Sequence, residues 1–483
     1  MSTLDQRYLL DDEAMRRFIL NGYVTIRTEV PSSLFDEAYR QIHGADNRAF
    51  GNDLPGEVPA LMEVLRDPVV RGVLVSILGP GYRMASHRHC HHSPPQPADA
   101  SPGWHVLDEH PFHKDATWPA QHRCRRVMSV FYPHECTPDM GPTAVIPGSQ
   151  YYTRSFGAYG HDAIQTAGPA GTITFVHYDM WHGGTCNYSD KHRYMMKFVF
   201  ERFDEPTSPS WNCQDRTWRP VQQGPSGDHH PRLWQCMWDW YCGTAHNGNG
   251  HRDGHDVPHL IEGLRHDDER ISLYNAYALA QFGERVVGPL RDQLVEESEE
   301  SPHENLNGRK YMPGGGPFEL YYAGYALAAI GPPAVPALAE LLQHPQWWVR
   351  AAAADVLREM GRPASAAAGS LIQALQDDDK RVRNHAAKAL GTAEASFPEV
   401  TAALIEQLSD EEADAKVESA GALARIKPAD DTAVRALISA LENEHVYVRG
   451  NAAAALERIG TEEARRSAAE FHASHPGEVC IGG

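Results

Sequence analysis

The chain has 483 residues, more than one ordinary hydrophobic core holds, so its length predicts at least two domains. A composition of 42% hydrophobic and 22% charged residues is typical of globular proteins, and no apolar run approaches the roughly 20 residues that span a bilayer. The net charge of −20 disfavours nucleic acid as a partner. It is uneven, with 23 basic against 28 acidic residues in 1–254 and 21 against 36 in 255–483.

The eight cysteines are scattered and form no C-x-x-C pair, which favours free thiols in a reducing cytoplasm over a disulfide framework. The first residues lack a basic flank followed by an apolar stretch, so we expect no signal peptide. We therefore expect a cytoplasmic protein without a membrane partner.

Residues 1–203 predict a domain rich in short strands. A helix from Asp11 to Asn21 runs into a strand that begins at Gly22, and a second helix follows at 32–43. Short β-rich runs separated by Gly and Pro turns then favour a barrel or jelly roll; they cover 124–132, 143–147, 171–177 and 194–200.

Residues 204–254 form a connecting segment with five tryptophans. A free linker would be rich in Gly, Ser or charge and poor in aromatic residues. We interpret the tryptophans mainly as packing at a domain junction, with a lid over the active site as the alternative, and we expect the following domain to dock on the first.

Residues 255–470 predict an all-α solenoid, followed by a tail at 471–483. A pattern that begins with valine and continues with alanines and leucine recurs, with the valines at 349, 382, 417 and 448. Two earlier copies lie near Ile271 and Leu320, and amphipathic stretches precede the later copies. A period in the thirties with two helical patterns per unit indicates paired helices that stack on their neighbours. The pattern resembles HEAT repeats of the short bilin-lyase type, which implies a surface for a protein partner or for self-association.

A possible metal site begins with an H-x-D pair, because two imidazoles and one carboxylate on one face of a non-haem iron leave three positions open. H-x-D occurs four times, at His113, His177, His251 and His266. Only His113-Lys-Asp115 is followed by a second histidine in a strand setting, His182, with Arg193 eleven residues later. A planar guanidinium there could bind a carboxylate through two parallel hydrogen bonds.

A competing assignment uses His177, Asp179 and His259, with Arg270 as the cation. We disfavour it because His259 lies in repeat sequence and because it leaves Trp181-His182 unexplained. Trp118, just past the H-x-D pair, is a candidate for the wall of a substrate pocket, as are His105 and His110.

The first half resembles the phytanoyl-CoA dioxygenase family of 2-oxoglutarate oxygenases over roughly residues 10–205. The matching runs are Arg17-Phe-Ile-Leu-Asn-Gly-Tyr-Val, Leu78-Gly-Pro-Gly-Tyr, Phe112-His-Lys-Asp-Ala, Gly141-Pro-Thr-Ala-Val-Ile-Pro-Gly-Ser-Gln and Trp181-His-Gly-Gly-Thr-Cys-Asn-Tyr-Ser-Asp-Lys-His-Arg. The resemblance implies a double-stranded β-helix (a jelly-roll or cupin-like α+β domain). It also implies Fe(II) on His113, Asp115 and His182, and 2-oxoglutarate held by Arg193.

The same resemblance implies an enzyme that uses O₂ and 2-oxoglutarate to hydroxylate a C–H bond of a small-molecule substrate. In related halogenases a Gly or Ala stands at the position of Asp115, so the carboxylate favours hydroxylation. Alternatives are a desaturase or epimerase on the same site, a HEAT-repeat interaction scaffold with an inactive barrel, and a bilin lyase, which would not need the iron ligands.

Overall fold

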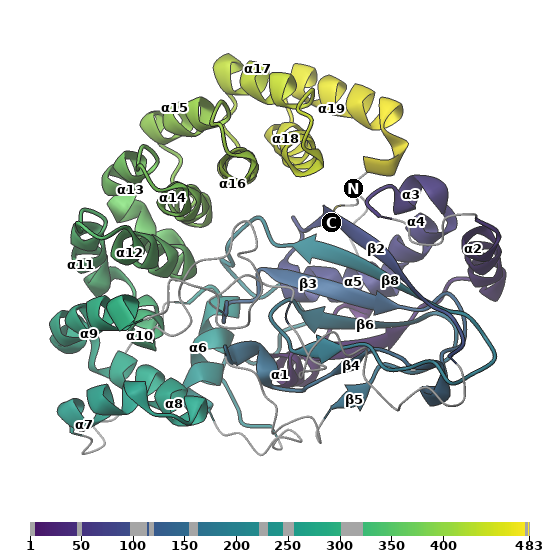
Figure 1. Cartoon of the computed structure of the whole chain (residues 1–483), viewed down its shortest axis with the longest axis horizontal. Helices are drawn as coiled ribbons and strands as arrows, with labels where there is room; N and C mark the ends of the chain where they lie inside the picture. Colours follow the sequence, from purple (N-terminus) through teal and green to yellow (C-terminus); the bar gives the residue numbers. More distant parts are fainter. Residues whose placement is uncertain are drawn as a thin grey trace.

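The computed structural model describes residues 5–45, 51–96, 114, 120–153, 163–221, 230–244, 256–300, 322–478 and 482. It has two parts, a β-rich N-terminal half and an arc of paired helices that curves around one side of it (Figure 1). The expected fold class, an oxygenase-like β-rich domain followed by a helical HEAT-type region, is confirmed.

The N-terminal half opens as the sequence predicts. Helix α1 (Asp12–Asn21) begins where the Asp11 side chain accepts a hydrogen bond from the Ala14 amide, and it ends at Gly22, whose φ of 77° reverses the chain into strand β1 (Tyr23–Arg27). The remaining helices of this part are α2 (Ser32–Gly44), α3 (Leu54–Glu57), α4 (Ala60–Leu65) and α5 (Pro68–Leu78), of which α5 packs on β1 and β8.

Two antiparallel sheets follow. The larger has the order β1-β6-β3-β8-β2 and the smaller the order β5-β4-β7. Their strands are β2 (Arg83–Ser93), β3 (Arg126–Phe131), β4 (Ala144–Val145), β5 (Ile164–Gln165), β6 (Thr172–His177), β7 (His182–Gly183) and β8 (Arg193–Glu201). Strand β2 has no counterpart among the expected elements, because buried positions such as Ser86 and Arg88 are polar and break the apolar alternation.

The two sheets pack through their apolar faces. Val145 of the smaller sheet lies in one cluster with Met128, Val176 and Val199 of the larger one. Their strand pairs do not join into a closed barrel within the described residues, so the strands form a two-sheet sandwich with the core between the layers.

The connecting segment packs against both parts, as the sequence predicts. Helix α6 (Pro231–Tyr241) contacts α1 on one side and α8 of the solenoid on the other. All five tryptophans are buried, and Trp238 has no exposed surface. The indole N–H groups of Trp211, Trp238 and Trp240 each donate a hydrogen bond, to Asp12, the Arg216 carbonyl and Glu205.

The solenoid contains thirteen α-helices in the described residues. They are α7 (Val257–Glu262), α8 (Glu269–Leu279), α9 (Val287–Glu300), α10 (Tyr322–Ile330), α11 (Val335–Leu341), α12 (Trp347–Met360), α13 (Ala368–Ala374), α14 (Lys380–Thr392), α15 (Pro398–Gln407), α16 (Ala413–Ile426), α17 (Asp431–Ala440), α18 (Val446–Ile459) and α19 (Glu462–Ser474). Helices α10, α12, α14, α16 and α18 lie side by side along the arc.

The structure corrects the register of one repeat. Val349, Val382 and Val448 are buried, but Val417 is only half-buried, and the buried residue at the equivalent position is Ala415. The four positions 349, 382, 415 and 448 are therefore spaced uniformly by 33 residues. The sequence pattern favoured Val417 because valine carries a stronger apolar signal than alanine, although the smaller side chain occupies the helix contact.

The arc contacts the N-terminal half along its length, which confirms the expected docking. Tyr277 of α8 and Tyr325 of α10 reach the segment 120–122, α12 meets Arg125, and α18 packs on the edge strand β2 (Figure 1).

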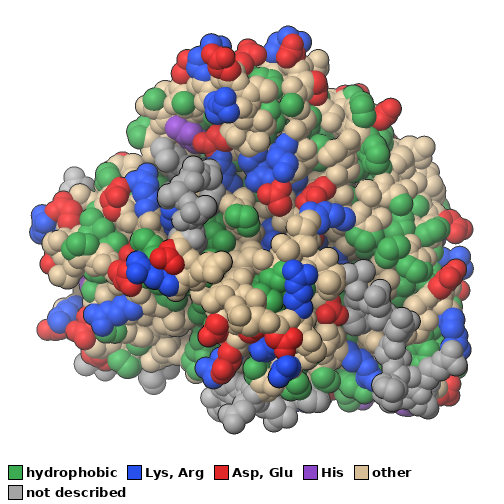
Figure 2. All heavy atoms as spheres, turned by 180° about the vertical axis from the view of Figure 1, so that it is seen from behind, with side chains coloured by type: hydrophobic (Ala, Val, Ile, Leu, Met, Phe, Trp, Pro, Cys, Tyr) green, Lys and Arg blue, Asp and Glu red, His purple; other side chains and the backbone are tan. Residues whose placement is uncertain are grey.

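Figure 2 shows the molecule from behind, with Lys and Arg side chains interspersed among Asp and Glu over the described part of that face. In the part of the chain that the structure describes, no helix combines the length and apolar character that a bilayer crossing requires.

Candidate functional site

His182 is buried at the start of β7. Its backbone pairs with Val145 of β4, and the preceding Trp181 amide donates to the Ser149 hydroxyl at 3.0 Å. The His182 Nδ1 lies 3.0 Å from the carbonyl oxygen of Met180, so Nδ1 carries the proton and donates. That tautomer leaves the lone pair on Nε2, the arrangement in which a histidine can ligate a metal ion.

Arg193 is the first residue of β8 and is 4% exposed. Its Nη1 donates to the Gly141 carbonyl, while Nε is buried without a hydrogen-bond partner. No carboxylate of the described residues forms an ion pair with this guanidinium, which is unusual for a buried charge. The group has the donors and the unbalanced charge that would suit a bound carboxylate.

The segment 141–145 connects these two residues. Val145 pairs with His182, and the Gly141 carbonyl accepts from Arg193. Gly141 has a φ of 69°, and a Cβ there would lie 2.4 Å from the backbone of Cys186. Because Gly141 has no side chain, the chain after β7 can lie directly against the segment 141–145, which also contacts Arg193.

Lys114, the residue between His113 and Asp115, is half-buried beside the His182 turn, with its Nζ atom buried. Its Nζ lies 5.7 Å from the centre of the Trp181 ring and has no hydrogen-bond partner. Burial lowers the pKa of Lys114, whereas Asp179 and Glu269 oppose that shift; burial likewise raises the pKa of Asp179, opposed by Lys114. The Asp179 carboxylate also accepts from the Gln121 amide at 3.2 Å.

The competing ligand set does not come together. His177 and Asp179 are both buried at the end of β6, but His259 is exposed on α7 of the solenoid. Among the described residues, which include all three, no group of His, Cys, Asp and Glu has the arrangement of a metal site. Burial lowers the pKa of His177 to about 3, so this imidazole is neutral at physiological pH.

Sequence reasoning missed the residues that the solenoid contributes here. The hydroxyl of Tyr277 lies 2.7 Å from Nδ1 of His122, and the Tyr325 hydroxyl donates to the Ala120 carbonyl at 2.8 Å. Glu269 accepts from the Thr153 amide at 2.5 Å. Tyr277 and Tyr325 occupy the same repeat position, two residues before a buried leucine, and this pair of large polar aromatics among alanines was the available signal.

His113, Asp115, Trp118, His105 and His110 lie outside the described residues, so their predicted roles stay predictions. Of the predicted site residues, the structure describes His182 and Arg193.

Comparison with known families agrees with the resemblance seen in the sequence. Residues 29–195 match the model of the phytanoyl-CoA dioxygenase (PhyH) family, and residues 320–391 and 401–479 match HEAT repeats. No curated protein matches the chain.

Solved structures similar to part of this chain include the α-ketoglutarate-dependent epimerase SnoN from nogalamycin biosynthesis, at 15% identity and a TM-score of 0.32, covering 40% of this chain and 83% of that one. The non-haem monooxygenase ThoJ in a nickel complex has 15% identity and a TM-score of 0.31, covering 44% and 90%. HygX from Streptomyces hygroscopicus, with nickel and 2-oxoglutarate bound, has 13% identity and a TM-score of 0.31, covering 40% and 87%.

Proposed function

We propose, taking the family match of residues 29–195 as the premise, that the N-terminal half is a non-haem Fe(II)- and 2-oxoglutarate-dependent oxygenase. Iron would be held by His113, Asp115 and His182, and the distal carboxylate of 2-oxoglutarate by Arg193. The reaction we propose is hydroxylation of a C–H bond of a small-molecule substrate, with O₂ as the oxidant.

The observation that carries this proposal is the state of Arg193. The Arg193 guanidinium is 4% exposed, its Nε lacks a hydrogen-bond partner, and it has no carboxylate partner in the described chain. Burying such a group costs free energy of folding unless a ligand supplies the missing acceptor. A carboxylate accepting two parallel hydrogen bonds from it would satisfy both the charge and the orphaned donor.

The neighbours of the other proposed ligands support the same reading. Because Nδ1 of His182 faces the Met180 carbonyl, Nε2 is the ring nitrogen that would ligate the iron. Lys114 is a covalent neighbour of both His113 and Asp115, and its side chain packs over Trp181, next to His182. This contact brings Lys114 next to the turn that leads into His182, 68 residues later in the sequence, which supports the proposed ligand set.

When bound, iron and 2-oxoglutarate would supply the chemistry that activates O₂ for C–H oxidation, with succinate and CO₂ as the co-products. The chain's own contribution is positional. Burial of His182 and Arg193 excludes bulk water from the site, and the Met180 carbonyl fixes the imidazole ring. The Gly141 carbonyl fixes one end of the guanidinium, so that its remaining donors are oriented before the cosubstrate arrives.

The test is anaerobic titration of the full chain with Fe(II) and 2-oxoglutarate, followed by its weak visible charge-transfer band. We expect the band in the wild type and loss of iron binding in Asp115→Ala. Arg193→Ala should keep iron but weaken 2-oxoglutarate binding by roughly 10- to 100-fold, because a charge-assisted pair of hydrogen bonds is lost.

Arg466→Ala is the matched control, since Arg466 is exposed on α19 and should leave both measurements unchanged. A folded, iron-loaded wild type without the band would contradict the cosubstrate assignment and favour the interaction scaffold. Succinate release measured against a panel of compounds would then identify the substrate and separate hydroxylation from desaturation by the product formed.

A further inference from the structure

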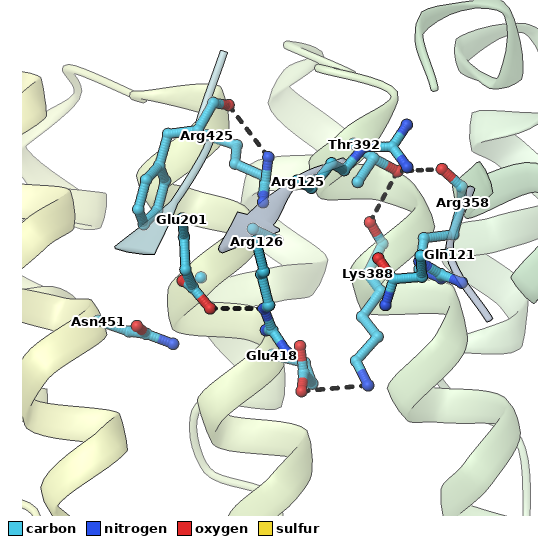
Figure 3. A pocket seen from close by; sticks show the side chains of 14 residues that line it. Gln121, Arg125, Arg126, Glu201, Arg358, Lys388, Thr392, Glu418, Arg425 and Asn451 are labelled. Atoms are coloured by element: carbon cyan, nitrogen blue, oxygen red, sulfur yellow. Dashed lines mark hydrogen bonds and ion pairs between the residues drawn. The ribbon is translucent and has the colours of Figure 1, made fainter. Parts of the chain in front are cut away.

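A polar cavity lies between the two parts of the molecule, and neither His182 nor Arg193 lines it (Figure 3). One wall is formed by the segment leading into β3 and by the end of β8, and the other by helices α12, α14, α16 and α18. Its volume is about 70 Å³. That space accommodates a few water molecules or one small oxyanion.

The cavity is lined by five basic side chains and two acidic ones. Four of the basic side chains form ion pairs with nearby carboxylates: Arg125 with Glu205 at 2.6 Å, Arg126 with Glu201 at 2.7 Å, Arg358 with Asp355 at 2.6 Å and Lys388 with Glu418 at 3.3 Å. The fifth basic side chain, Arg425 of α16, is the exception.

Arg425 has no carboxylate within ion-pair distance among the described residues. Its Nη1 donates to the Phe203 carbonyl at 3.2 Å, and the guanidinium carbon lies 5.2 Å from the centre of the Phe203 ring. Burial lowers the pKa of Arg425 to about 10, so the group is still charged at neutral pH. Arg425 is one of the residues that line the cavity.

The repeats of the solenoid provide an internal comparison. Glu359, Thr392, Arg425 and Arg458 occupy equivalent positions at intervals of 33 residues, on the side of the arc that faces the N-terminal half. Glu359 pairs with Arg125 at 3.2 Å, and Arg458 pairs with Asp204 at 2.7 Å. Arg425 is thus the one charged member of this series without an ion-pair partner among the described residues, although Glu201 and Glu205 lie near enough to raise its pKa.

Small residues keep the space beside Arg425 open. A Cβ at Gly391 would lie 2.8 Å from Cα of Ala422 and 3.2 Å from Cδ of Arg425, so a side chain there would displace the arginine. At the repeat position that holds Asp355 and Lys388 in the two preceding units, α16 has Gly421. The cavity exists because this repeat lacks a side chain that would fill it.

We propose that this cavity binds one small oxyanion, a carboxylate or a phosphate, with Arg425 as its principal contact. A planar guanidinium suits either group, because both offer two oxygens to parallel N–H donors. The anion would lie between the solenoid and the segment leading into β3, and would supply the ion-pair partner that Arg425 lacks. This site does not depend on the iron assignment and is tested without iron.

The experiment is calorimetric titration of the metal-free full chain with inorganic phosphate and, separately, with acetate, at constant ionic strength. We expect saturable binding of one equivalent of at least one of the two anions, with a Kd on the order of 1 mM or lower. The melting temperature should rise with the same concentration dependence. The anion that binds shows whether the site takes a phosphate or a carboxylate. If neither binds, the proposal is wrong.

Two variants of opposite expected effect locate the site. Arg425→Gln should weaken binding roughly tenfold or more, because it removes the charged contact. Glu418→Gln should strengthen binding about fivefold, because it removes a carboxylate from the lining and leaves Lys388 without its partner. A gain in affinity cannot arise from misfolding, so the second variant remains informative even if the first is unstable.

The matched controls are Arg435→Gln and Glu470→Gln, which change the same residue types at exposed positions on α17 and α19. Both should bind the anion as the wild type does. Equal losses in Arg435→Gln and Arg425→Gln, or unchanged binding in Glu418→Gln, would show that the anion binds elsewhere and would overturn the proposal.

Discussion

Arg193, Arg425 and Arg125 show how differently one residue type is used in this chain. Neither Arg193 nor Arg425 forms an ion pair with a carboxylate of the described residues, and we propose a bound anion beside each. Arg125 is as buried as Arg193 but is bound by Glu205 and Glu359, so its charge is satisfied within the protein. A buried arginine whose carboxylate partners belong to the same chain contributes to packing and stability. A buried arginine without such partners indicates a binding site.

Glu205 should make the folded state sensitive to acid. Burial opposes its ionisation, but Arg125 outweighs burial and holds the pKa of Glu205 at about 2, below its ordinary 4.5. This depressed pKa stabilises the fold above about pH 4.5, and the contribution, roughly 3 kcal/mol, is lost as the pH falls toward 2. We expect the melting temperature of Glu205→Gln to fall less steeply than that of the wild type between pH 4.5 and 2.

The control for Glu205→Gln is Glu470→Gln, an exposed carboxylate on α19 whose removal should leave the wild-type acid dependence unchanged. If the melting temperature of Glu205→Gln falls with acid as steeply as that of the wild type, other carboxylates dominate the loss of stability.

The sequence predicted part of the site, for reasons that differ from residue to residue. His182 and Arg193 could be predicted because they follow H-x-D in a strand setting, and the structure does bring both onto the segment 141–145. Tyr277 and Tyr325 were missed because their roles depend on how the solenoid packs against the segment 120–122, although their shared repeat position was a signal. Lys114 was missed because its contact with Trp181 joins two segments that are far apart in the sequence.

Among the elements, α6 has an unusual amount of aromatic surface to bury. The apolar face of a helix needs a partner, and α6 has two, α1 before it and α8 after it. The elements α1, β3 and β8 were predictable because their periodicity is local. Strand β2 was not predictable, because its buried positions hold Ser86 and Arg88, and the Arg88 guanidinium is satisfied by a distant carbonyl, that of Gly477.

Trp238→Ala should destabilise the whole protein. The indole is fully buried, its N–H donates to the Arg216 carbonyl at 2.8 Å, and Trp211 packs against it at 5.1 Å between ring centres. A cavity of this size typically costs about 3–5 kcal/mol, so we expect the melting temperature to drop by several degrees. Differential scanning calorimetry of the full chain measures the change.

Phe397→Ala is the control for Trp238→Ala, because Phe397 is 48% exposed and should shift the melting temperature little. Equal shifts in the two variants would show that burial of α6 does not hold the two parts together.

At the scale of the molecule, the solenoid packs on the N-terminal half and supports its structure; it is not a module on a tether. Fragments 1–203 and 1–254 should therefore be poorly soluble or should melt well below the full chain, although each contains every proposed iron ligand. The first fragment exposes the surface that α6 covers, and both leave Arg125 without Glu359 and His122 without Tyr277.

Expression of the two fragments beside the full chain, with comparison of solubility, melting and iron binding, measures this dependence. A soluble 1–203 fragment with the full chain's stability and iron affinity would contradict it.

The arc is attached to the N-terminal half at both ends, so it responds to strain differently from a helical-repeat rod with a free end. Tyr277 binds His122 near its beginning, and near its end His87 of β2 meets the Tyr447 hydroxyl at 3.0 Å, while Arg458 reaches Asp204. A rod held at one end can flex by small rotations summed over its repeats. An arch held at both ends cannot lengthen without pulling on the sheet, so a strain imposed on any one repeat is carried to both supports.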